Sequence, residues 1–102
     1  MLSGLKLPAR LRMDGARAAW AQLSPALRAE AAQVLAAAGR EVRLSAAELA
    51  DFDSSALSLL LSAARQCSEQ GATLKLEGVP DKLRELARVY GVAELFWPPA
   101  AA

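Results

Sequence analysis

The stretch 52–61 constrains the fold most, because it joins a strand-like pattern to a helix-like one. Before it, residues 41–44 (Glu-Val-Arg-Leu) alternate polar and apolar, as a half-buried strand does. From Leu57 onward, leucines recur at helical spacing. Residues 53–55 (Asp-Ser-Ser) lie between the two patterns and have short polar side chains that accept hydrogen bonds at the start of a helix. The sequence therefore predicts a strand–turn–helix unit with hydroxyl groups at its turn.

Strand-like and helix-like segments also alternate along the rest of the chain. Strands are expected over residues 5–7, 10–13, 40–44, 73–77 and, as a short last strand, 92–97. Helices are expected over residues 15–38, 54–70 and 80–90. Pro25 is expected either to kink the first helix near Ser24 or to split it in two. This order indicates an α/β fold, with a small mixed open sheet of four to five strands covered by about three helices.

The length of 102 residues predicts one domain over residues 1–102, with residues 97–102 as a loose tail. The net charge of +1 gives no electrostatic footprint for nucleic acid. Neither a signal peptide nor the run of about 20 apolar residues that spans a bilayer is visible. A single cysteine, Cys67, excludes an internal disulfide and suits a reducing compartment. We therefore expect a cytoplasmic chain with no direct membrane insertion.

The sequence contains no histidine, which removes the commonest general base and metal ligand. A Ser-His-Asp triad cannot be built, and a metal site would depend on carboxylates alone beside one cysteine. The six glycines are scattered singly, so there is no glycine-rich phosphate loop. We expect no catalytic residue, no metal, no cofactor and no enzymatic activity.

A helical wheel divides the helix over residues 54–70 into a buried face and an exposed arc. The core side is expected to hold Leu57, Leu60, Leu61, Ala64 and Ser68. The opposite arc holds serines and Leu59, which together favour a flat surface where another protein docks, whereas a solvated face with one isolated leucine is the alternative. Partner contacts are predicted at Ser54, Ser55, Ser58, Leu59 and Ser62, with the helix over residues 80–90 nearby.

Two interpretations of the hydroxyl groups at the turn remain open. Serines before a helix commonly cap it, and Ser54 is the better N-cap while Ser55 is better exposed. Alternatively, Ser55 or Ser54 is phosphorylated, and the phosphate would repel or block a partner there. Asp53 is expected to brace the turn through hydrogen bonds to the backbone rather than to catalyse a reaction.

The helix over residues 80–90 is amphipathic. Its apolar residues recur at i, i+3, i+4 and i+7, so the buried face is expected to consist of Leu83, Leu86, Ala87 and Tyr90. Its outer side carries both basic and acidic residues, which favours a solvated face over a phosphate site.

The order of elements and the Asp-Ser-Ser-Ala-Leu turn resemble the STAS family, the fold of bacterial anti-sigma factor antagonists. Four segments in order carry the resemblance, namely residues 42–44, 52–61, 71–79 and 83–92. Within the family, the Leu-Ala-Arg-Val-Tyr-Gly-Val sequence at residues 86–92 looks most like the small MlaB-like STAS subunit of the Mla phospholipid-transport complex. The N-terminal part departs from the family, since its strand pair is abbreviated and its first helix is long.

The resemblance implies a cytosolic accessory subunit, peripheral to the inner membrane through its partner. That partner would be the ATPase subunit of an ABC transporter, in a system that keeps outer-membrane lipids asymmetric. By position, the functional hydroxyl of the family falls on Ser54 for transporter subunits and on Ser55 for phosphorylation-switched antagonists. The alternative implied is an anti-sigma factor antagonist whose partner is an anti-sigma factor serine kinase.

Overall fold

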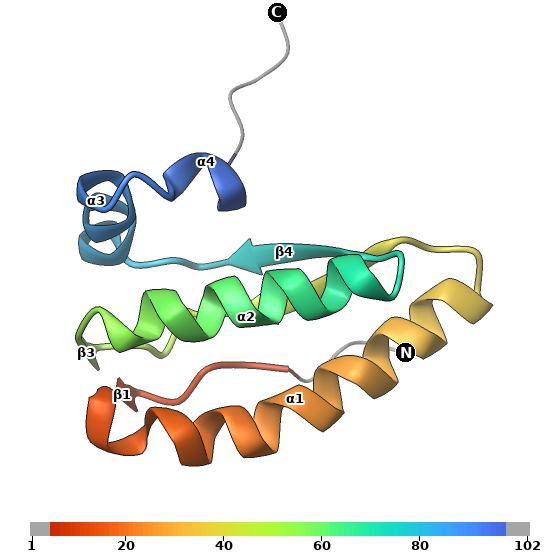
Figure 1. The fold of residues 1–102 in the computed structure, drawn as a ribbon, viewed down its shortest axis with the longest axis horizontal. Coiled ribbons are helices and arrows are strands. Elements are labelled where there is room, and N and C mark those ends of the chain that lie inside the picture. The colour runs from red at the N-terminus through yellow and green to blue at the C-terminus, as the bar shows by residue number, and fades with distance from the viewer. Residues whose placement is uncertain (1–4, 98–102) are drawn as a thin grey trace, which may run out of the picture.

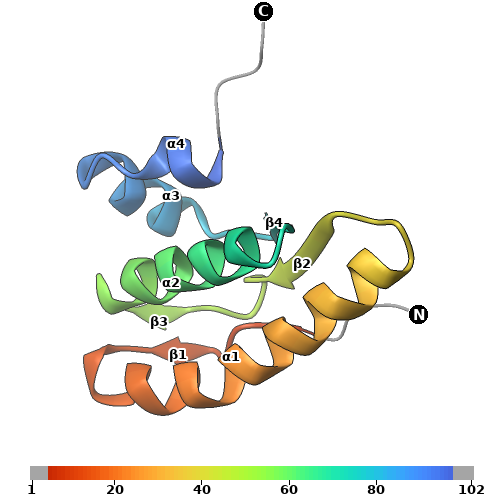
Figure 2. The same ribbon diagram turned by 45° about the vertical axis from the view of Figure 1, so that its right-hand side comes forward.

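The structure, a computed structural model, describes residues 5–97 and has the predicted α/β class. Its elements are β1 (Arg10–Leu11), α1 (Met13–Ala36), β2 (Glu41–Ser45), β3 (Asp51–Phe52), α2 (Ser55–Glu69), β4 (Thr73–Glu77), α3 (Asp81–Val89) and α4 (Ala93–Phe96). In Figures 1 and 2, α2 lies in the middle, with α1 along one side of it and α3 and α4 on the other.

β2 and β4 form a parallel pair in which apolar residues are aligned with apolar residues and polar with polar. Val42 lies opposite Leu74, and Arg43 lies opposite Lys75. The two apolar residues are buried or partly buried, whereas the two charged residues are exposed. One face of this pair therefore packs against the helices while the other remains polar and open.

The N-terminal segment, residues 5–11, runs parallel to residues 45–52 and bridges the two strand pairs. The Leu7 amide donates to the carbonyl oxygen of Ser45 at 2.8 Å. Further along, the amides of Ala50 and Asp51 both donate to the carbonyl oxygen of Ala9. The segment then pairs with β3 as strand β1. These hydrogen bonds bring the start of α1 next to the turn that leads into α2.

α1 begins at Met13, two residues earlier than expected, and continues unbroken through Pro25 to Ala36. The predicted split at the proline therefore does not occur. The axis of α1 bends along its length in both views (Figures 1 and 2). Pro25 lies on the exposed side of the helix, where the missing amide hydrogen bond is compatible with a bend.

α2 is buried on two sides, because both the strands and α1 pack against it. Its buried residues are Ala56, Leu57, Leu59, Leu60, Ala63 and Cys67. This set covers a wider arc than a helix that contacts a sheet alone would bury.

The short last strand expected over residues 92–97 is wrong, because Ala93–Phe96 form helix α4. The amide of Trp97 donates to the carbonyl oxygen of Ala93 at 2.8 Å, so the backbone is paired locally. Trp97 was expected to begin a loose tail, but it packs against the core. The centroid of its ring lies 4.6 Å from the guanidinium carbon of Arg84. The rest of the expected tail, residues 98–102, lies outside the described residues.

Candidate functional site

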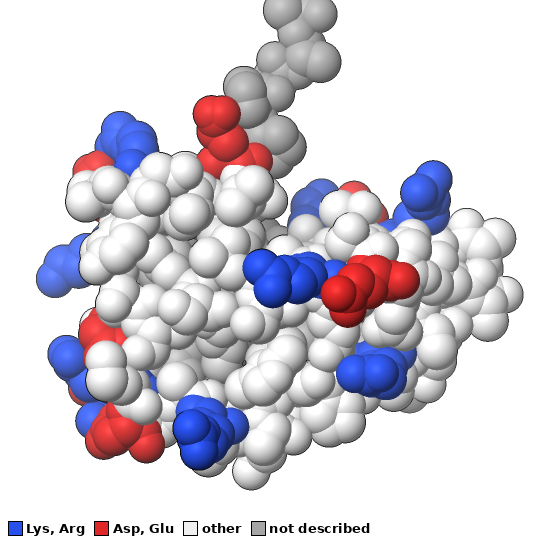
Figure 3. Space-filling model, in the orientation of Figure 1, with Lys and Arg blue, Asp and Glu red and all other residues white. Residues whose placement is uncertain are grey.

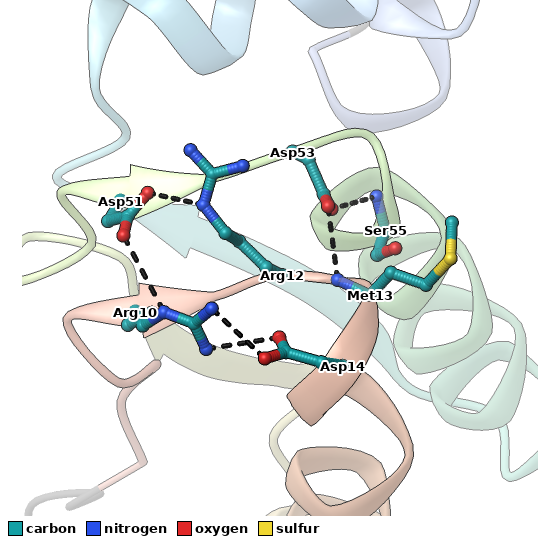
Figure 4. A network of polar contacts seen from close by, with 7 residues as sticks. All are labelled: Arg10, Arg12, Met13, Asp14, Asp51, Asp53 and Ser55. Carbon is teal, nitrogen blue, oxygen red and sulfur yellow. Dashed lines mark hydrogen bonds and ion pairs between the residues drawn. The ribbon is translucent and has the colours of Figure 1, made fainter.

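The turn between β3 and α2 is held by the carboxylate of Asp53 (Figure 4). One oxygen, Oδ1, accepts a hydrogen bond from the backbone amide of Ser55 at 2.9 Å. The other oxygen, Oδ2, accepts one from the backbone amide of Met13 at 3.1 Å. The bond from Met13 and then that from Ser55 lower the pKa of Asp53 below its ordinary value. One ionised carboxylate therefore joins the first residues of two helices.

Charged side chains on β1, β3 and α1 surround this link (Figure 4). Arg10 donates to both carboxylate oxygens of Asp14, at 3.0 and 3.1 Å, and these bonds lower the pKa of Asp14. Arg10 and Arg12 both form ion pairs with Asp51 on β3. All of these groups are about half exposed, so the pairs orient the start of α1 more than they stabilise the fold.

Ser54 occupies the N-cap position of α2, but its side chain makes no capping hydrogen bond. Its backbone is helical, with φ −64° and ψ −14°, whereas a capping serine is usually extended. Asp53 accepts the hydrogen bond from the Ser55 amide instead. The hydroxyl of Ser54 is therefore not used to cap the helix.

The prediction that Leu59 is exposed is wrong. Its side chain is only 5% exposed and belongs to the hydrophobic core together with Leu7 and Leu23. The helical wheel assumed one buried face, whereas α1 covers a second face of α2 that includes Leu59. This side chain therefore offers a partner very little contact area while α1 and α2 remain packed.

The predicted serines lie at or near the surface. Ser58 and Ser62 are exposed, and Ser54 and Ser55 are partly exposed. Ser68, which was expected in the core, is also exposed. α2 has no charged residue before Arg65. Figure 3 shows an uncharged area over the left part of the front of the molecule, while a basic and an acidic group lie side by side to the right of its centre.

Two open grooves border the start of α2. The first, the α1–α2 groove, is lined by Met13, Ala16, Arg17, Trp20, Ser55, Ser58, Leu59 and Ser62. The second, the turn–α3 groove, is lined by Phe52, Asp53, Ser54, Lys82, Glu85, Leu86, Val89 and Tyr90. The four predicted serines are thus divided between two grooves on either side of the first turn.

Each groove has an exposed apolar side chain that sequence reasoning did not assign to the site. Met13, in the α1–α2 groove, is 76% exposed, and Val89, in the turn–α3 groove, is also 76% exposed. Tyr90 was expected on the buried face, but it is 59% exposed because α3 ends at Val89. Val89 and Tyr90 are consecutive bulky residues at a helix end and cannot both face the core, so this pair in the sequence indicates an exposed apolar side chain.

The described residues hold no group of three or more His, Cys, Asp or Glu side chains that could bind a metal. Within residues 5–97, no helix is long and apolar enough to cross a membrane. Cys67 is a buried thiol, and its burial raises its pKa.

Comparison with known proteins adds one finding. A family model described as "Mlab, STAS domain" matches residues 3–97, which is nearly the whole chain. A search of curated proteins gives no match.

Proposed function

The chain belongs to the STAS-domain family, and from this premise we propose that it is a non-enzymatic accessory subunit of an ABC-type phospholipid transporter. Membership of this family supports a role as a small accessory or regulatory protein. The proposed partner is the ATPase subunit, whose assembly and activity the chain would support. The proposed location is the cytoplasmic side of the inner membrane, reached through that partner. The name Mlab in the matching family description and the resemblance of residues 86–92 support this choice.

The observation that carries the proposal is the uncharged, exposed start of α2 between two grooves. Charged residues are depleted at the centre of protein interfaces and remain at their rims. On the front of the molecule, an uncharged area over the left part is bordered by charged side chains (Figure 3). Small serine side chains at the centre allow the backbone of a partner to approach α2 closely.

Apolar contacts at this surface would come from α1 and α3 rather than from Leu59. Met13 borders one groove, and Val89 and Tyr90 border the other. Tyrosine is enriched among the residues that dominate binding energy at interfaces. We therefore propose Ser54, Ser55, Ser58, Ser62, Met13, Val89 and Tyr90 as the partner contacts.

The proposal is tested by co-purification with an ABC-transporter ATPase subunit from the same organism. Ser58→Arg places a long charged side chain at the centre of the surface, and Tyr90→Ala removes an apolar side chain from its edge. Each is expected to weaken binding at least about tenfold. Ser68→Arg is the matched control, because Ser68 is an exposed serine on the same helix outside both grooves.

Far-UV circular dichroism should be the same for all three variants and the wild type, because each position is exposed. If Ser58→Arg and Tyr90→Ala both bind the ATPase subunit as the control does, the surface is not the docking site. If the wild type does not bind it, the proposed partner is incorrect.

The hydroxyl of Ser54 makes no capping hydrogen bond, which favours a second candidate, an anti-sigma factor antagonist switched by phosphorylation. Here the partner would be an anti-sigma factor serine kinase, and Ser55 or Ser54 would accept the phosphoryl group. Incubation with the kinase and ATP should add the mass of one phosphoryl group, and Ser54→Ala or Ser55→Ala should abolish it. If incubation with every serine kinase tested adds no phosphoryl group, this candidate is contradicted.

A further inference from the structure

The charged side chains that line the two grooves differ in whether they have partners within the chain. The turn–α3 groove contains Asp53, Lys82 and Glu85, and the α1–α2 groove contains Arg17. The carboxylate of Asp53 accepts hydrogen bonds from two backbone amides. Glu85 accepts hydrogen bonds from Arg88 on the next turn of α3. Both acidic groups therefore have hydrogen-bond partners within the chain, although only Glu85 is paired with a cation.

The two cations are not engaged in this way. Arg17 and Lys82 are exposed, and neither makes an ion pair or a hydrogen bond through its side chain within residues 5–97. Asp81 is adjacent to Lys82 in sequence but lines a different hollow, with Arg84 and Arg88. Each groove consequently presents one positive charge without a partner, next to an exposed apolar side chain.

From this pattern we infer the chemistry of the partner segment: it is apolar at its centre and has one carboxylate that faces Arg17 and another that faces Lys82. This inference rests on the proposed function, because it specifies which surface of the ATPase subunit docks here. The apolar centre would contact Met13, Val89 and Tyr90. A basic or uncharged segment would leave both cations unmatched at the rim of the interface.

Rim charges act mainly on the rate of association and on its dependence on salt. Reversing both cations replaces two attractions with two repulsions, so the variant Arg17→Glu/Lys82→Glu should bind about tenfold or more weakly. Raising the salt from about 0.05 M to about 0.5 M should weaken the wild type and leave the double variant unchanged or tighter.

The matched control is Arg40→Glu/Lys75→Glu, which changes the net charge by the same amount. Arg40 and Lys75 are also exposed and lie outside both grooves. The control should bind the ATPase subunit within about twofold of the wild type, because long-range charge effects are screened.

The experiment measures the Kd of the wild type and both double variants for the ATPase subunit at the two salt concentrations. A selective loss in Arg17→Glu/Lys82→Glu supports the inference. Equal Kd values for the wild type and both variants, or equal losses in both variants, overturn the inference and leave the proposed function intact. Failure of the wild type to bind overturns the proposed function and this inference with it.

Discussion

Ser58 and Leu59 are neighbours in α2 with opposite environments, so substitutions at these positions separate stability from docking. Ser58 is exposed at the centre of the proposed surface, whereas Leu59 is buried beneath it. Leu59→Ala should destabilise the fold while changing little of the surface that a partner contacts, because only 5% of Leu59 is exposed. Ser58→Arg should do the reverse.

The size of the effect at Leu59 follows from its burial and its surroundings. Removing a buried leucine side chain costs about 2–5 kcal/mol, of which part is transfer energy and part is the cavity left behind. Leu59 borders the α1–α2 groove and a second groove lined by Leu7 and Leu23, so neighbours can move into part of the space. We therefore expect the free energy of unfolding to fall by about 2–3 kcal/mol. For a domain of this size the melting temperature should fall by roughly 10–20 °C.

Urea unfolding followed by far-UV circular dichroism measures this loss. The m-value should be unchanged, because the same surface is exposed on unfolding. Ser58→Ala is the control and should lie within about 0.5 kcal/mol of the wild type. Below its transition, Leu59→Ala should still bind the ATPase subunit as the wild type does. A loss at Leu59 no larger than that at Ser58 would refute the reasoning, because it would mean that α1 does not cover this face of α2.

Three further outcomes are expected from other parts of the fold. Gly78→Ala should lower the free energy of unfolding by about 1–3 kcal/mol, because φ is +66° and the new Cβ would lie 2.8 Å from that of Ala47. Gly71→Ala is the control, since φ there is +91° but no atom lies within 4 Å of the new Cβ, and it should lower the free energy of unfolding less. Equal losses for the two variants in urea titrations would contradict the clash at Ala47. Asp53→Asn should be less stable than the wild type near pH 7. Because folding lowers the pKa of Asp53, the contribution of its carboxylate to stability is present above the ordinary carboxyl pKa of about 3.9 and is lost as the pH falls through the folded-state pKa. The urea midpoints of the wild type and Asp53→Asn should therefore converge below about pH 4. A difference between the midpoints that does not change with pH would contradict the role of the ionised carboxylate. The thiol of Cys67 should react with Ellman's reagent only after denaturant is added, since burial raises its pKa and blocks access; rapid reaction in the native state would contradict its burial.

The elements that the sequence predicted well are those whose pattern depends on short-range periodicity. β4 was expected over the residues where it occurs, and α2 begins within one residue of its expected start. A two-residue alternation or a recurring leucine reports which side of a segment is buried, and that suffices for a fold class. The segment 92–97 is too short for either period to be distinguished, which is why helix α4 was mistaken for a strand.

The errors within the candidate site arose where burial depends on elements distant in sequence. The wheel could place Leu59 opposite Leu57, but not show that α1 lies over that side of the helix. It could place Tyr90 in phase with Leu83, but not show that α3 stops packing before that residue. The serines near the start of α2 were located more accurately than Ser68, because small polar residues at a helix start remain near the surface whichever neighbour covers the helix.

This division explains why the sequence assigned the apolar contact of the proposed surface to Leu59, which is buried. The position of that surface at the start of α2 was predicted from the turn at residues 53–55. The hydroxyl groups belong to α2, but the apolar side chains beside them belong to α1 and α3. Their arrangement depends on Asp53, which joins the first residue of α1 to the first residue of α2. A substitution at Asp53 should therefore weaken docking through the displacement of Met13, even though the Asp53 carboxylate, engaged by two amides, is not expected to contact the partner itself. Docking that survives Asp53→Ala while Met13→Ala abolishes it would show that the packing of α1 holds Met13 in place without this link.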